Sequence, residues 1–344
     1  MSTLSATRPA ASDADDTVLA IEDLKVSFGS GTKQIRAVDG VDLTLKRGET
    51  LALLGESGSG KSVTLRSVLR LHDERRTRIS GRIRAVGRDV LELSQRELAD
   101  FRGRQAAMIF QEPMLALDPV YTLGQQIIEA IRRHERVDRA EARDRARVLF
   151  ELVQIPSASQ RLDAYPHEMS GGMRQRAMIA LALACRPRLL LADEPTTALD
   201  ATVQIQILLL LRDLQRDFGL AMVFVTHDIG AAIEVADTIA VMYAGRIVES
   251  GPVRKVARTP AHPYTQGLLA TRAAEGGLNA GLALAGGSKR TSRLPAIPGS
   301  PPDPADLPPG CAFAPRCSKA EAACRAAPPP PRMVRAGQMS RCIK

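Results

Sequence analysis

The apolar residues of this chain follow two patterns that alternate along the sequence. Continuous apolar runs at 189–192 and 221–226 are typical of strands that are buried on both faces. The segment between them has apolar residues every three or four positions, which predicts one buried helix face: Val203, Ile207, Leu210, Leu211 and Leu214. Strands that alternate with helices predict an α/β fold around a largely parallel sheet.

The first half of the chain adds two further parts to this plan. Residues 18–28, 37–45 and 50–54 are strand-like and separated by glycine-containing turns, and we expect an antiparallel β subdomain beside the parallel sheet. Residues 122–184 are mainly helical, and we expect a helical subdomain of about 113–180 inserted into the sheet domain.

The ends of the chain differ in composition from the main domain, which we place at 18–270. Residues 1–17 are rich in Ser, Ala and Asp, which predicts a disordered leader and not a secretory signal. Residues 271–292 are predicted to be a linker. The extension at 293–344 holds twelve of the 22 prolines, so we expect it to lack regular helix or sheet and to fold around a bound group, or not at all.

The chain has 344 residues, of which 44% are hydrophobic and 25% charged, an ordinary globular mixture. No run approaches the ~18 apolar residues that a membrane-spanning helix needs, so a cytoplasmic location is expected. The net charge is +9, and residues 286–344, with ten basic and three acidic side chains, supply +7 of it. The nearly neutral main domain therefore does not indicate a nucleic-acid partner.

A phosphate-binding loop is the strongest chemical signal. Residues 55–62 read GESGSGKS and match G-x-x-x-x-G-K-[ST] between a predicted strand and a predicted helix. Backbone N–H groups of such a loop surround phosphate oxygens, Lys61 reaches the β- and γ-phosphates, and Ser62 holds Mg²⁺. The predicted nucleotide-binding residues are Gly55, Glu56, Ser57, Gly58, Ser59, Gly60, Lys61, Ser62 and Val63.

Two acids follow the apolar strand at 189–192. Asp193, at its carboxyl end, is predicted to hold Mg²⁺ together with Ser62. Glu194 would lie beside the γ-phosphate, where a carboxylate can polarise an attacking water. The two motifs together predict a P-loop NTPase.

Residues 169–176, MSGGMRQR, resemble the signature motif of the ATP-binding-cassette (ABC) family, usually written LSGGQ. In that family the signature faces the nucleotide of a second subunit, so Ser170, Gly171 and Gly172 are expected to bind ATP held by a partner. Other family elements follow in order. The resemblance implies that Gln111 senses Mg²⁺, that His227 contacts the γ-phosphate, and that two further residues lie at the nucleotide: the D-loop Asp200 and the adenine-stacking Phe28.

A narrower resemblance is to the ATPases of oligopeptide/dipeptide importers. It rests on SGGM at 170–173, which is typical of the D-type ATPase, on 242–249, and on HPYT at 262–265. It implies an ATP-hydrolysing subunit on the cytoplasmic face of the inner membrane. The implied partners are an F-type ATPase, two permease subunits and an extracytoplasmic peptide-binding protein.

Substrate and class leave alternatives open. Relatives also handle nickel or glutathione, and the sequence does not choose among these cargoes. Soluble ABC ATPases of DNA repair or translation usually carry two cassettes or long insertions, whereas this chain has one P-loop and one signature. An exporter ATPase would fit the motifs but not the cysteine-rich extension.

Four of the five cysteines lie in the extension, spaced C-x5-C-x6-C-x17-C: Cys311, Cys317, Cys324 and Cys342. In a cytoplasmic protein such a cluster is more often metal-binding than disulfide-bonded. Because some peptide-importer ATPases bind a [4Fe–4S] cluster in this region, the resemblance implies such a cluster here. Zinc and reduced free thiols remain the alternatives.

Overall fold

The computed structural model describes residues 16–29, 34–197, 199–274 and 297–344, and only the backbone of 272–274. Most of the predicted leader and linker therefore lies outside the described residues. Where their edges are described, the elements run further than expected. Strand β1 (Thr17–Phe28) begins inside the predicted leader, and helix α11 (Pro263–Ala274) extends into the predicted linker.

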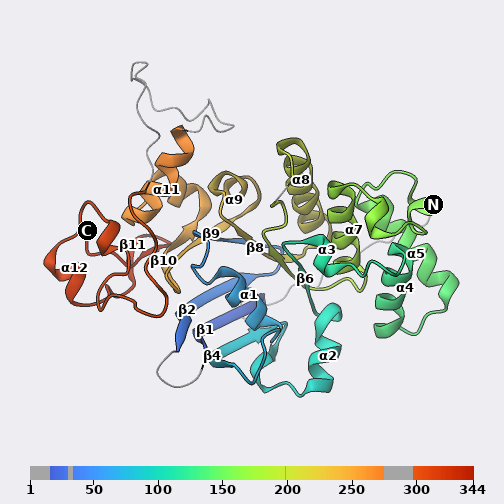
Figure 1. Ribbon diagram of the computed structural model, residues 1–344, viewed down its shortest axis with the longest axis horizontal. Helices are drawn as coiled ribbons and strands as arrows, with labels where there is room; N and C mark the ends of the chain where they lie inside the picture. Colours follow the sequence, from blue (N-terminus) through green and yellow to red (C-terminus); the bar gives the residue numbers. More distant parts are fainter. Residues whose placement is uncertain (1–15, 30–33, 198, 275–296) are drawn as a thin grey trace.

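An antiparallel sheet of four strands forms one layer of the molecule (Figure 1). Its order is β2-β1-β4-β5, with β2 at Ile35–Lys46, β4 at Thr77–Ala85 and β5 at Arg88–Asp89. Along β1 and β2 buried side chains alternate with exposed ones, because only one face packs against the core. This sheet covers helix α1 (Lys61–Val68) and one face of the larger sheet through a shared apolar cluster.

The larger sheet has the order β11-β12-β10-β9-β3-β8-β7-β6. Five neighbouring strands are parallel, as expected: β9 (Thr238–Tyr243), β3 (Thr50–Leu54), β8 (Ala221–Thr226), β7 (Leu189–Asp193) and β6 (Ala106–Ile109). Every residue of β3, β6, β7 and β8 is buried, because helices and the antiparallel sheet cover both faces. Strand β10 (Arg246–Pro252) pairs antiparallel with β9.

The remaining helices of this part pack around the parallel strands. Helix α8 (Ala201–Phe218) buries Ile207, Leu210, Leu211 and Leu214 on one face, as the spacing predicts. The others are η1 (Val90–Glu92), α2 (Gln95–Arg104), α9 (Ile229–Val235) and α10 (Val253–Arg258).

A group of helices between β6 and β7 lies at one end of the molecule, on the right in Figure 1. It consists of α3 (Pro113–Ala116), α4 (Leu123–His134), α5 (Arg139–Leu152), α6 (Ala158–Arg161), η2 (Pro166–Glu168) and α7 (Gly171–Leu183). The apolar face of α4 packs with α5 and α7 around Ile131 and Phe150, which are fully buried.

The C-terminal extension lies at the opposite end (Figure 1) and corrects one expectation. It contains regular structure: η3 (Ala314–Arg316), α12 (Ala322–Ala326), β11 (Arg332–Arg335) and β12 (Gln338–Ser340). The β11–β12 hairpin adds two strands to the large sheet, with Glu249 of β10 opposite Ser340. Prolines 328–331 precede the hairpin, so they end the preceding segment without removing donors from the strands. Within the described residues, no helix combines the length and the apolar character needed to cross a bilayer.

Candidate functional site

An open cavity of about 760 Å³ lies over the carboxyl ends of the parallel strands. Eleven residues that the sequence analysis singled out line it: Gly55, Glu56, Ser57, Gly58, Gly60, Lys61, Ser62, Val63, Gln111, Glu194 and His227. The other two lining residues are Ala37 of β2 and Leu268 of α11. The topology thus brings together predicted residues that lie up to 172 positions apart (55 to 227).

The loop after β3 has the backbone that phosphate binding requires. Gly60 caps α1 with φ at 105°, in the left-handed region, and a Cβ there would lie 2.4 Å from the Ala37 carbonyl oxygen. Only glycine fits this position. Lys61 is 4% exposed and donates through Nζ to the carbonyl oxygens of Gly55 (2.8 Å) and Glu56 (3.0 Å). Its ammonium therefore lies inside the loop, and burial lowers its pKa.

Ser62 and Asp193 form a pair suited to a magnesium ion. Ser62 Oγ donates to Asp193 Oδ1 at 2.7 Å, and Asp193 is fully buried, which raises the pKa of its carboxyl group. Its second oxygen, Oδ2, is buried with no hydrogen-bond partner among the described residues; the nearest cation is the Arg66 guanidinium at 4.0 Å. A hydroxyl and a carboxylate with a free oxygen are hard donors of the kind that Mg²⁺ prefers.

Glu194 is held from several sides. Its Oε2 accepts a hydrogen bond from Thr197 Oγ1 (3.0 Å), contacts His227 Nδ1 (3.2 Å) and lies 3.5 Å from Gln111 Nε2. Its Oε1 lies 3.8 Å from Lys61 Nζ. The hydrogen bond to His227 is the main reason why the pKa of Glu194 is lowered, and it raises the pKa of His227 in turn. Glu194 is therefore an ionised carboxylate at the cavity wall, as a general base must be.

The signature residues lie outside this cavity. Ser170 is the N-cap of α7, where its Oγ accepts from Met173 N, and Ser170 and Gly171 are exposed. Gly172 lets α7 approach α8, because a Cβ there would lie 2.8 Å from Val203 Cγ1. Asp200 caps α8 by accepting from Val203 N at 3.0 Å. Within one chain these residues act as helix caps and helix–helix contacts; residue 198 lies outside the described residues.

Three other predicted nucleotide residues do not line the cavity. Phe28 packs edge-on against His72, with ring centroids 5.5 Å apart. Ser59 is buried, and Asp193 lies behind Ser62. For Phe28 the structure thus supplies a packing partner and no contact with the cavity.

Three site residues were missed by the sequence analysis. Thr197 follows Glu194 by three positions, a spacing that a turn can bring within hydrogen-bond reach. Tyr264 accepts a hydrogen bond from Glu56 N (2.9 Å), and Arg316 makes an ion pair with the Glu56 carboxylate (2.8 Å). Tyr264 and Arg316 lie 208 and 260 positions from Glu56, so no local sequence pattern could indicate these two contacts.

The four cysteines of the extension line one small pocket, beside His262 and Phe313. All are free thiols, and burial raises the pKa of Cys311, which favours its protonated form. Among the described residues, no group of three or more His, Cys, Asp or Glu side chains is arranged to hold a metal ion. The four cysteines predicted as iron–sulfur ligands therefore line the same pocket, but within the described part of the chain they are not arranged to hold a metal ion.

Comparison with known families gives two matches. Residues 38–197 match the ABC transporter family, and residues 248–324 match the C-terminal region of oligopeptide/dipeptide transporters. The chain is 48% identical over 325 residues to a Brucella abortus protein named "putative peptide import ATP-binding protein", covering 94% of each chain. A second B. abortus protein with this name is 48% identical over 333 residues, covering 95% of this chain and 97% of the relative.

Solved structures agree with these matches. The dimeric ATP-binding cassette MJ0796, bound to ADP and Pi in a post-hydrolysis state, is 28% identical with a TM-score of 0.62, covering 69% of this chain and 99% of that one. The protein cbiO1 of Clostridium perfringens, part of an ABC transporter complex, is 26% identical with a TM-score of 0.61, covering 71% and 92%. The P-loop NTPase fold expected from the motifs is confirmed. This chain belongs to the ABC transporter family as an ATP-binding cassette, an ATPase that carries the C-terminal region of oligopeptide/dipeptide transporters.

Proposed function

We propose that this chain is the ATP-hydrolysing subunit of an importer for di- and oligopeptides, bound peripherally to the cytoplasmic face of the inner membrane. The observation that carries this proposal is the near full-length similarity to peptide import ATP-binding proteins, which includes the extension as well as the cassette. Nickel and glutathione are the alternative cargoes. A soluble ATPase of DNA repair or translation would not account for the transporter-type C-terminal region.

The catalytic base in this proposal is Glu194. Thr197 and His227 orient its carboxylate, and the lowered pKa keeps it ready to accept a proton from a water molecule that attacks the γ-phosphate. Lys61 supplies positive charge at the β- and γ-phosphates. His227 and Gln111 face the cavity beside Glu194, where they can contact the γ-phosphate and its metal.

Ser62 and Asp193 would hold the magnesium ion, with Gln111 nearby. The fully buried carboxylate with one free oxygen supports this assignment. When bound, Mg²⁺ supplies charge neutralisation at the phosphates.

A second, F-type ATPase would complete the nucleotide site. The exposed Ser170 and Gly171 lie outside the chain's own cavity, which supports their use on ATP held by the partner. Backbone N–H groups at the start of α7 suit a phosphate. Each cavity would then be closed by the other subunit's signature motif, with Asp200 near the shared contact.

The segment 110–121, which includes Gln111, supports a docking site for the two permease subunits. It carries several large apolar side chains that are exposed: Phe110, Met114, Leu115, Val120 and Tyr121. Exposed apolar patches of this kind mark contacts with other proteins. Because the patch starts next to Gln111, movement of the permeases can reach the catalytic carboxylate directly.

The test of the assembly is purification of the tagged chain from gently solubilised native membranes, with its partners identified by mass spectrometry. We expect two multi-span permeases, a second ATPase with an SGGQ motif and the associated extracytoplasmic binding protein. Peptide binding by that protein would support the cargo, whereas nickel or glutathione binding would replace it. Recovery of ribosomes or DNA-repair proteins would overturn the importer proposal.

The test of the base is Glu194→Gln. ATP binding persists because the P-loop and Asp193 are unchanged, and turnover falls at least ~100-fold because the proton acceptor is lost. Hydrolysis by the assembled transporter measures this, with Glu92→Gln, which changes an exposed acid, as the control. Unchanged turnover would remove Glu194 from the catalytic role.

For the extension we propose a [4Fe–4S] cluster on Cys311, Cys317, Cys324 and Cys342. The convergence of all four on one pocket supports it, and four thiolates are the ligand set of such a cluster. Anaerobically purified protein should contain iron and sulfide in equal amounts. Zinc without sulfide would support zinc as the bound metal. If the protein contained neither iron nor zinc, the four cysteines would be structural thiols.

A further inference from the structure

The P-loop is tied to the C-terminal extension through one of its own side chains. Arg316 donates from Nη1 to Glu56 Oε2 (2.8 Å) and from Nη2 to Glu56 Oε1 (3.2 Å). The Arg316 side chain is 7% exposed and the Glu56 side chain 24%, so water reaches this two-point ion pair mainly from the Glu56 side. Charge pairs with this geometry are stronger and more directional than surface pairs.

Contacts other than those with Glu56 also hold the guanidinium of Arg316 in place. Its Nε donates to the Pro298 carbonyl oxygen (2.8 Å), and Nη1 also contacts Tyr243 Oη (3.2 Å). Its central carbon lies 5.8 Å from the ring centroid of Tyr243 and 5.9 Å from that of Phe313. These contacts leave the side chain little freedom, so Arg316 can set the position of Glu56 and not merely follow it.

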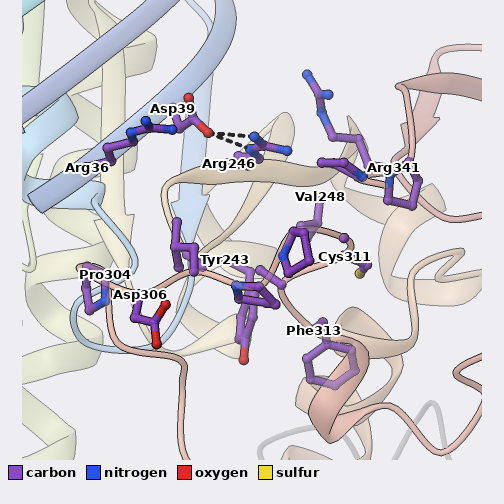
Figure 2. A pocket seen from close by; sticks show the side chains of 18 of the residues that line it. Arg36, Asp39, Tyr243, Arg246, Val248, Pro304, Asp306, Cys311, Phe313 and Arg341 are labelled. Atoms are coloured by element: carbon purple, nitrogen blue, oxygen red, sulfur yellow. Dashed lines mark hydrogen bonds and ion pairs between the residues drawn. The ribbon is translucent and has the colours of Figure 1, made fainter. Parts of the chain in front are cut away.

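The surrounding packing joins the extension to the cassette. The rings of Tyr243, Tyr264 and Phe313 lie within 4.7–5.4 Å of one another. Figure 2 shows Tyr243 of β9 near Phe313 and Pro304 of the extension, in a pocket that Arg36 and Arg246 also line. Prolines 301, 302 and 304 line a second small pocket together with residues 56–59 of the P-loop.

Glu56 connects this cluster to Lys61 of the P-loop. Its carboxylate binds Arg316, its N–H donates to Tyr264 Oη, and its carbonyl oxygen accepts from Lys61 Nζ at 3.0 Å. Glu56 also lines the nucleotide cavity. Without the guanidinium, a carboxylate with no counter-charge would remain in the loop that must receive a triphosphate, and like charges in a partly buried site repel strongly.

We infer that Arg316 is a positioning residue for ATP binding: it neutralises Glu56 and fixes the P-loop from the C-terminal extension. The extension thereby becomes part of the nucleotide site, although none of its described residues lines the main cavity. The inference concerns ATP affinity and is independent of the transported cargo.

The test is equilibrium titration of the purified full-length chain with a fluorescent, non-hydrolysable ATP analogue. We expect Arg316→Ala to weaken binding roughly 5- to 20-fold, and turnover at saturating ATP to change less than twofold. Arg316→Lys keeps the charge but not the two-point contact. We expect its affinity for the analogue to lie between those of the parent chain and of Arg316→Ala. Arg325→Ala, which changes an exposed arginine of the same extension, is the matched control.

Glu56→Gln in the Arg316→Ala background separates charge from folding. If the unpaired Glu56 carboxylate causes the loss of ATP affinity, removing its charge should restore most of that affinity. If Arg316→Ala instead unfolds the extension, Glu56→Gln should not restore it. Unchanged affinity in Arg316→Ala would overturn the inference. So would a loss that Glu56→Gln does not reverse, or an equal loss in Arg325→Ala.

Discussion

Glu194 has an unusual backbone conformation for its residue type. Its φ is 46°, in the left-handed region, which costs a non-glycine residue about 1–3 kcal/mol. Such strain persists where the surroundings hold it, and here Thr197 Oγ1, His227 and the Val225 carbonyl oxygen, which accepts from Glu194 N, all do so. The conformation turns the carboxylate out of the strand end and into the cavity, where it can reach water.

The contact between His227 and Glu194 predicts a pH dependence of stability in the nucleotide-free chain. The pKa of His227 is raised above 6.5, mainly by its hydrogen bond to Glu194; Asp228 acts in the same direction and Lys61 in the opposite one. The resulting stabilisation is full below pH 6.5 and is lost as the pH rises through the folded-state pKa. The pKa of Glu194 is lowered below 4.5, so the stabilisation that this carboxylate contributes is present above pH 4.5 and is lost as the pH falls through its folded-state pKa.

We therefore expect the melting temperature of His227→Ala to differ most from that of the parent near pH 5.5 and to converge with it near pH 9. The His227 side chain is 62% exposed, so solvent screening keeps the effect below about 1 kcal/mol. Thermal unfolding across this pH range measures it. His167→Ala, which removes an exposed histidine stacked on Tyr165, is the control. A difference that grows towards pH 9 would contradict the assigned contact.

Residue patterns predicted the site where the chemistry is local. The P-loop and the pair of acids after a buried strand each lie within a few residues, and the fold places the P-loop and Glu194 at one cavity, with Asp193 bound to Ser62. Phe28 shows the limit of such reasoning, because its place in the sequence could not reveal that His72 is its packing partner. Arg316 shows the opposite limit: it is 260 residues from Glu56, and only the folded extension joins them.

At the scale of elements, apolar periodicity predicted the strands and helices that are buried through apolar residues of their own sequence. Strands β7 and β8 and helix α8 lie close to the predicted ranges, because continuous apolar runs and a single apolar face leave few other solutions. The parallel order of these strands follows from the helices between them.

The β11–β12 hairpin could not be predicted in this way. Its strands are only four and three residues long, β11 is mostly exposed, and four prolines precede it, so the hairpin carries little local signal. Their stability comes from distant partners. Buried Gln338 donates to Glu249 Oε1 (2.8 Å), and Glu249, itself fully buried, accepts from Ala261 N and His262 N. Gln338 also donates to the Thr259 carbonyl oxygen, so β10 and the segment after α10 together supply these tertiary contacts.

At the scale of the whole molecule, the two ends have different tasks. The helical subdomain at one end carries the exposed apolar patch and the signature, which suits contacts with other subunits (Figure 1). The extension at the other end packs into the cassette core through Phe313 and reaches the P-loop through Arg316. In the proposed assembly, partner subunits and the extension would therefore act on the nucleotide cavity from opposite ends of the chain.

Coupling between two sites is reciprocal, so an extension that supports ATP binding must itself be stabilised by ATP. We expect the non-hydrolysable analogue to slow amide hydrogen exchange at 311–317 as well as at the P-loop. In Arg316→Ala at saturating analogue, protection should persist at the P-loop and disappear from the extension, whereas Arg325→Ala should behave as the parent chain. Protection confined to the P-loop of the parent chain would show that the two parts share a boundary without exchanging free energy, and the extension would then act only as a structural cover.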